Sequence, residues 1–217
     1  MPNLKEKTTE KEGSTVLSEQ LLACQRALEA RGFAVRLCGT GEEARDFVLS
    51  QVPAGAVIGV GGSVTIRQIG LADALRDRGH TVHWHWYVPG PETLHAANNA
   101  DVYLSSANAV TMDGLLVNID MTGNRVAALT YGPAQVYVIC GRNKLVQGGV
   151  PQAIARIKRE ACPSNARRLG LSTPCAALDR CDAAHCENPM CRVTGVLEHP
   201  TRGHAVTVLL VDEDLGY

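Results

Sequence analysis

The stretch "DVYLSSANAVTMDGLLVNIDMTGNRVAALTYGPAQVYVIC", residues 101–140, sets two short apolar segments on either side of a long polar one. "DVYLSSA" and "QVYVIC" have the apolar, β-branched and aromatic composition of buried strands. Between them "MDG" is a turn signal, and "LLVNID" predicts a return strand. We therefore expect a hairpin to project from the end of the first strand. Connections this long in a compact α/β domain are usually functional.

The same alternation continues on both sides of this stretch. Further strands are predicted at 33–38 ("FAVRLC"), 56–62 ("AVIGVGG"), 81–88 ("TVHWHWYV") and 204–211 ("HAVTVLLV"). Helical apolar periodicity or caps mark 17–28, 40–48, 66–79, 91–100 and 150–157. Buried strands separated by helices predict an α/β fold with a doubly wound, mostly parallel open sheet.

The length of 217 residues suits a single domain with additions. Residues 1–13 are charged and without periodicity, and are predicted to be a flexible tail. Residues 14–217 then form the α/β domain. Residues 162–203 are expected to be a cysteine-rich loop inserted before the last strand.

Composition excludes several classes of partner. Lys and Arg number 21 and Asp and Glu 22, giving a net charge of −1 without a basic stripe, so nucleic acid is not expected as a partner. The first residues lack the apolar centre of a secretory signal, and no apolar run approaches the roughly 20 residues of a membrane span. We expect a cytoplasmic protein whose thiols stay reduced.

The glycine-rich segment "GVGGSVT", residues 59–65, follows a buried strand and precedes a helix. Glycines let the backbone approach a ligand closely, and free N–H groups there favour an anion. The alternative is a tight turn without a ligand. The ligand-binding residues predicted here are Gly61, Gly62, Ser63 and Thr65.

Polar side chains of the hairpin and of the next loop are expected at the carboxyl ends of the strands, where open α/β sheets bind ligands. Arg125 could contact a carboxylate or phosphate with two hydrogen bonds, and Lys144 could act as a point charge. The alternatives are Asn and Asp that satisfy turn backbone, and a solvated loop lysine. The predicted set is Asn108, Thr111, Asp113, Asn118, Asp120, Asn124, Arg125, Asn143 and Lys144.

Two further patterns hold metal-ligand residue types. His83 and His85 in "HWHW" would share one face of a strand and could form a metal pair, although tryptophans facing the core with histidines outward is the simpler interpretation. Four cysteines, Cys175, Cys181, Cys186 and Cys191, fall within seventeen residues. Their spacing matches neither zinc knuckles nor a ferredoxin run. An iron–sulfur cluster, zinc, a redox dithiol or disulfide, and structural thiols all remain open. Cys24 and Cys140 are expected in the core. Cys162, at the expected end of the last helix before Pro163, is a spare ligand.

The motifs "GVGGSVTIRQIGL", "ADVYLSSANAVTMDGLLVNIDMTGNRVAAL", "VICGRNKLV" and "VLLVDEDLGY" resemble the lactate-utilisation (LUD) domain family, in the small stand-alone form related to lactate utilisation protein C. More remotely, the second motif is similar to a segment of ribose-5-phosphate isomerases, CoA transferases and folinate cyclo-ligase. That resemblance implies a NagB/RpiA/CoA transferase-like sheet whose glycine loops bind phosphorylated or acidic small molecules. Ile119 stands where those relatives often have lysine.

The resemblance implies an accessory or redox-associated role in the oxidation of lactate or another organic acid. It implies an anionic small molecule as ligand, and iron–sulfur subunits of a lactate-oxidising complex as partners; homo-oligomerisation stays open. "TPCA", Cys181 and Cys191 fit a cysteine segment of the stand-alone proteins, which suggests a 4Fe-4S cluster or zinc, while Ala184 stands where another cysteine is expected. The alternative function is an enzyme or sensor for a phosphorylated or CoA-linked metabolite, without redox chemistry.

Overall fold

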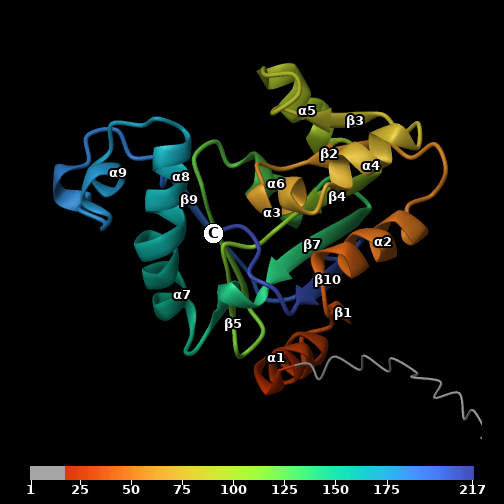
Figure 1. The fold of residues 1–217 in the computed structure, drawn as a ribbon, viewed down its shortest axis with the longest axis horizontal. Helices are drawn as coiled ribbons and strands as arrows, with labels where there is room; N and C mark the ends of the chain where they lie inside the picture. Colours follow the sequence, from red (N-terminus) through yellow and green to blue (C-terminus); the bar gives the residue numbers. More distant parts are fainter. Residues whose placement is uncertain (1–17) are drawn as a thin grey trace, which may run out of the picture.

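Six parallel strands form the central sheet of the computed structural model, which describes residues 18–217 (Figure 1). The predicted tail at 1–13 lies outside the described residues. In spatial order the strands are β1 (Ala34–Cys38), β10 (Ala205–Val211), β7 (Gln135–Gly141), β4 (Val102–Ser105), β2 (Ile58–Val60) and β3 (Val82–Trp84). Every neighbouring pair runs parallel, as the sequence predicted.

Helices cover both faces of this sheet. One apolar cluster joins the sheet to α2 (Gly41–Gln51), α3 (Val64–Gln68) and α4 (Leu71–Asp77). A second cluster, on the opposite face, joins it to α1 (Glu19–Ala30), α5 (Pro91–Asn98) and α6 (Asn124–Thr130). Helices on both faces of a parallel sheet make this a doubly wound α/β fold.

The central strands are apolar because both of their faces are covered. Val208, Leu209 and Leu210 of β10 are fully buried, and their side chains alternate between the two clusters. Burying each such side chain stabilises the fold by about 1.5–3 kcal/mol relative to exposure.

The predicted hairpin is present and belongs to a second, smaller sheet. β5 (Ala109–Thr111) and β6 (Leu116–Asp120) pair antiparallel. β8 (Leu145–Val146) and β9 (Val193–Leu197) extend this sheet on either side. β9 lies inside the segment expected to be only a cysteine-rich loop.

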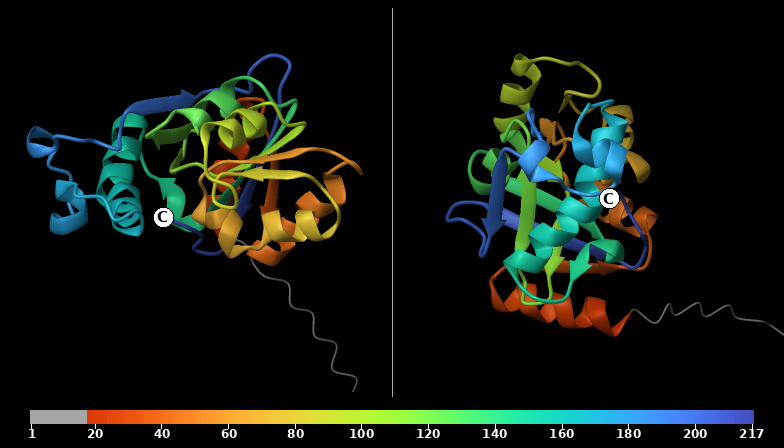
Figure 2. Two further views of the ribbon diagram at one scale, coloured as in Figure 1. Left: turned by 90° about the horizontal axis from the view of Figure 1, so that it is seen from above. Right: turned by 90° about the vertical axis from the view of Figure 1, so that its left-hand side faces the viewer.

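A helical layer packs on the second sheet and forms a lobe beyond the carboxyl ends of the large-sheet strands (Figures 1 and 2). It comprises α7 (Val150–Arg156), a π-helical turn η2 (Ile157–Ala161) and α8 (Cys162–Arg168). The helix was expected to end before Pro163, but it continues to Arg168. Proline has no N–H group and its ring clashes with the preceding turn, and the wider π turn accommodates it.

The remaining short elements are 3-10 turns and one short helix. They are η1 (Arg142–Lys144), α9 (Pro174–Leu178) and η3 (Ala183–His185). None of the helices within residues 18–217 combines the length and apolar character needed to cross a membrane.

Two element predictions need correction. The helix expected from Ile66 to Gly79 is split into α3 and α4, because Gly70 adopts a left-handed conformation with φ of +65°. The strand expected at 81–88 ends at Trp84 and continues as a turn, in which Tyr87 donates its backbone N–H to Trp84.

Candidate functional site

A cleft opens at the carboxyl ends of β2, β4 and β7, between the large sheet and α8. Its volume is about 70 Å³, roughly the space of two water molecules. Six residues that the sequence predicted as ligands line it together: Gly62, Ser63, Thr65, Asn108, Arg125 and Lys144. The cleft thus encloses a group the size of a carboxylate or a phosphate, with the rest of a larger molecule left outside.

Lys144 lies at the base of this cleft, in the turn that follows β7. Its side chain is 3% exposed, and its ammonium group donates hydrogen bonds to Thr65 Oγ1 at 2.8 Å and Ser106 Oγ at 2.7 Å. Both acceptors are neutral hydroxyls, and within the described residues Lys144 forms no ion pair. A buried cation without a counter-charge is costly, so burial lowers the pKa of Lys144 to about 8.

The glycine turn supplies one of the two hydroxyls at Lys144, that of Thr65, whereas Ser106 directly follows β4. Ser63 caps α3 by accepting the backbone N–H of Ile66 at 3.2 Å, so its hydroxyl serves the helix. Thr65 donates to the carbonyl of Leu215 at 3.3 Å, which holds the segment after β10 against the cleft. Gly61 does not line the cleft; a Cβ there would lie 2.9 Å from the Tyr103 hydroxyl, so close packing explains this glycine.

Arg125 lies at the cleft wall, but its guanidinium group is already engaged. It donates from Nε to Asp120 Oδ1 at 2.9 Å and from Nη2 to Asn108 Oδ1 at 2.7 Å. Asp120 and Arg125 form a buried ion pair. The sequence predicted that Arg125 donates two hydrogen bonds to a ligand. In the structure it donates them to Asp120 and Asn108 instead. Nη1 makes no hydrogen bond within residues 18–217.

The remaining predicted residues of this stretch do not line the cleft. Asn118 Oδ1 accepts the backbone N–H of Asn108 at 3.2 Å, and Thr111 Oγ1 accepts that of Leu115 at 2.9 Å. Asp113 is exposed at the hairpin tip, where it pairs at 3.6 Å with Arg31, the residue that directly follows α1. Asn124 begins α6 and does not line the cleft. Thr111 and Asn118 therefore follow the alternative interpretation, in which polar side chains hydrogen-bond to nearby backbone groups.

Asn143 belongs to the same η1 turn as Lys144 but does not line the cleft. It accepts the backbone N–H of Leu215 at 3.1 Å and donates to the carbonyl of Gly216 at 3.3 Å. Its role is to fix the segment after β10 beside Lys144, outside the cleft lining.

A second positive charge at the cleft comes from Arg168 in α8, which was not among the predicted residues. Its guanidinium carbon lies 4.6 Å from the centre of the Trp86 ring, a cation–π contact, and Nη2 donates to Asn165 Oδ1 at 2.7 Å. Burial lowers the pKa of Arg168. No carboxylate pairs with it within the described chain.

Several residues of the cleft were not predicted from the sequence, because the helix or strand that carries them was predicted with other bounds. Arg168 and Asn165 lie on a helix expected to end before Pro163, and Trp86 lies in an expected strand. Ser106 had a usable signal, because it directly follows a buried strand at the carboxyl edge.

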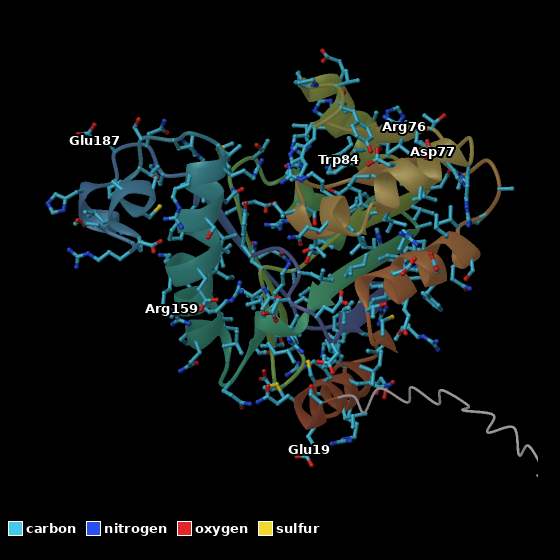
Figure 3. All side chains as sticks on the ribbon, in the orientation of Figure 1. Glu19, Arg76, Asp77, Trp84, Arg159 and Glu187 are labelled. Atoms are coloured by element: carbon cyan, nitrogen blue, oxygen red, sulfur yellow. The ribbon has the colours of Figure 1, made fainter. Side chains whose placement is uncertain are left out.

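The four predicted metal ligands line a second cavity together, between α8, α9 and the segment before β9. Its volume is about 250 Å³, and Cys162 of α8 joins Cys175, Cys181, Cys186 and Cys191 in its lining. Glu187 and Arg159, labelled in Figure 3, lie on the outer surface of this lobe. We call this space the thiol cavity.

Within the thiol cavity, Cys162 Sγ and Cys191 Sγ are 3.2 Å apart. This contact lowers the pKa of Cys191, and together with burial it raises the pKa of Cys162. All eight cysteines are free thiols; Cys24 and Cys140 are buried in the apolar core, as expected.

The side chains do not fit a metal ion in this arrangement. Among residues 18–217, no three His, Cys, Asp or Glu side chains converge closely enough to hold one ion. The iron–sulfur cluster or zinc site at the four cysteines therefore stays a prediction, and no chemical step is derived from it. His83 lies in β3 and His85 in the turn after it, so the strand that was to align them ends between them.

The parallel sheet, its flanking helices and the cleft at the carboxyl edge define an open, doubly wound α/β protein. A family model, the LUD domain, matches residues 23–211. The chain belongs to the LUD domain family, as its motifs indicated.

Among solved structures, the fold is similar to the crystal structure of a DUF162 family protein from Deinococcus radiodurans. The two chains share 17% sequence identity with a TM-score of 0.52, and the match covers 90% of this chain and 99% of the other. At this identity the likeness shows the fold. No curated protein matches the chain.

Proposed function

We propose that the cleft binds a small organic acid in its anionic form, and that the protein has an accessory role, beside iron–sulfur subunits, in the oxidation of lactate or a related acid. Membership of the LUD domain family suggests a role in lactate utilisation. The observation that carries the binding proposal is Lys144, a buried ammonium group at the base of a cleft with only hydroxyl partners.

The charge balance of the cleft favours an anion. Lys144 and Arg168 bring two positive charges, while the only buried carboxylate near the wall, Asp120, is already paired with Arg125 within the described structure. An anion placed between them would supply the missing counter-charge and form charge-assisted hydrogen bonds, which are the stronger kind.

The size of the cleft favours a small acid over a CoA-linked metabolite. Pockets that bury a drug-sized ligand typically measure 300–1,000 Å³. The volume here, about 70 Å³, suits a carboxylate with a short carbon chain. A phosphorylated metabolite could place only its phosphate group inside.

Lactate or pyruvate at about 100 times its dissociation constant is expected to raise the melting temperature by roughly 5–10 °C, because ligand at that excess stabilises by about 2.7 kcal/mol. The variant Lys144→Met should lose this shift, since it removes the charge at the base of the cleft. Lys158→Met is the matched control, because Lys158 does not line the cleft. Differential scanning fluorimetry measures both.

Equal ligand shifts in wild type and Lys144→Met would contradict the proposal. A larger shift with ribose 5-phosphate or acetyl-CoA than with the free acids would favour the alternative function, an enzyme or sensor for a phosphorylated or CoA-linked metabolite.

Acid binding should weaken as the pH rises through the pKa of Lys144, about 8. A bound anion favours the ammonium form and raises that pKa, so between the two values the affinity should fall by about tenfold per pH unit. Calorimetric titration of pyruvate at pH 7, 8 and 9 measures this slope, which should vanish in Lys144→Met.

Without ligand, the free energy of unfolding should change with pH in the opposite direction. A lysine in the unfolded chain holds its proton to higher pH than Lys144 does, so the contribution of Lys144 to stability rises with pH above about 8.

A further inference from the structure

We propose that Cys162 and Cys191 form a redox-active dithiol, which small disulfides convert reversibly into a disulfide bond between α8 and the segment before β9. The two sulfurs lie 3.2 Å apart, and a disulfide needs about 2.05 Å, so closure requires a movement of about 1 Å. Among the described residues this is the one pair of cysteine sulfurs within hydrogen-bonding distance.

The two sulfurs differ in exposure, and this assigns Cys191 to the first step of the exchange and Cys162 to the second. Cys191 is partly exposed and lines the thiol cavity, so a small disulfide can reach it first. Cys162 is 5% exposed and is already in contact with Cys191, so it is placed to resolve the mixed disulfide. A reactive, reachable thiol beside a buried resolving thiol is the arrangement of a redox-sensitive pair.

The exchange is balanced with glutathione disulfide as the oxidant. The thiolate of Cys191 attacks one sulfur of the small disulfide, forms a mixed disulfide and releases one glutathione. The sulfur of Cys162 then loses its proton, attacks Cys191 Sγ and releases the second glutathione. In total two protons and two electrons leave the protein and reduce one glutathione disulfide to two thiols.

The bond would also fix one wall of the cleft, and this step alone rests on the proposed function. Cys162 and Met190 line both the cleft and the thiol cavity. Asn165 contacts the Met190 sulfur at 3.9 Å, and its Oδ1 accepts a hydrogen bond from the guanidinium group of Arg168. On the other side, Arg192 donates its backbone N–H to the carbonyl of Asp120 at 2.9 Å. Cys191 therefore lies between Met190, which contacts the partner of Arg168, and Arg192, which is hydrogen-bonded to the partner of Arg125.

Peptide mapping of the unaltered protein tests the pair directly. The purified protein is equilibrated in glutathione buffers of increasing disulfide content, its free thiols are blocked, and its mass is measured. Digestion with trypsin and a Glu-specific protease leaves Cys162 alone in residues 161–167 and Cys191 alone in residues 188–192. We expect the oxidised protein to carry two blocking groups fewer than the reduced protein and to be lighter by a further 2 Da, the two hydrogens lost. We also expect one linked species that joins these two peptides and is reversed by dithiothreitol.

The variants supply the control. Cys162→Ser and Cys191→Ser should each abolish the linked species, while Cys181→Ser and Cys186→Ser, in the same cavity, should leave it unchanged. A disulfide that maps to another pair, thiols that all stay reduced across the buffers, or a metal in the freshly purified protein that protects all five thiols would overturn the proposal. Pyruvate titrations of the oxidised and reduced forms report on the cleft separately, so a failure of acid binding leaves the mapping result intact.

Discussion

Replacing Asp120 by alanine is expected to lower the free energy of unfolding by about 3–5 kcal/mol, the cost of leaving a buried charge without its partner. Asp120 is 7% exposed and Arg125 is 8% exposed, so water cannot take over the role of the carboxylate. The substitution also removes the acceptor for the backbone N–H of Val126, 2.9 Å from Asp120 Oδ2, in the first turn of α6. Urea denaturation followed by circular dichroism measures the loss.

Asp113→Ala is the matched control, because the same residue type there pairs with Arg31 at the exposed hairpin tip. Exposed pairs are worth about 0–1 kcal/mol, so this variant should be close to wild type. The double variant Asp120→Ala, Arg125→Met should recover part of the loss, since no unpaired charge remains. Equal losses in the single and double variants would show that the ion pair is not the cause.

Gly59→Ala is expected to destabilise the protein by about 3 kcal/mol or more, the upper range for an overpacked core. Gly59 lies in the middle of β2, and a Cβ there would stand 2.0 Å from the carbonyl oxygen of Ala97. That neighbour is backbone of α5, so no side chain can rotate away. The helix must shift away from the sheet instead.

Gly149→Ala is the comparison for this glycine. A Cβ at Gly149 meets nothing within 4 Å, and its φ of −99° is open to any residue. Thermal denaturation should show a melting temperature near that of wild type for Gly149→Ala and a clear decrease for Gly59→Ala. A small effect at both positions would mean that α5 is not held closely against β2.

The parallel sheet could be predicted because each of its strands carries its own signal. Strands such as β7 and β10 are covered on both faces, so they appear as continuous apolar runs bounded by turn residues. β9 could not be predicted from such a run. Its residues Val193 and Thr194 are exposed and it follows a cysteine-rich segment, so only its pairing with β6 makes it a strand.

The position of the cleft followed from the rule that ligands bind at the carboxyl edge, but the roles of single residues did not. Arg125 and Lys144 are both cations in loops after buried segments. Only the three-dimensional contacts show that Asp120 neutralises Arg125, while Lys144 faces two hydroxyls. Arg168 reaches the cleft through a helix that continues past a proline, which periodicity alone does not reveal.

The place of β10 in the sheet has a consequence for synthesis of the chain. β10 lies between β1 and β7, so Ala34 pairs with a residue as distant in sequence as Thr207. A nascent chain emerging from the ribosome therefore cannot complete its central sheet until residues 205–211 have been made. Until then the edges of β1 and β7 are unpaired, and such edges are prone to association with other chains. Pairing across so many residues also makes folding slow.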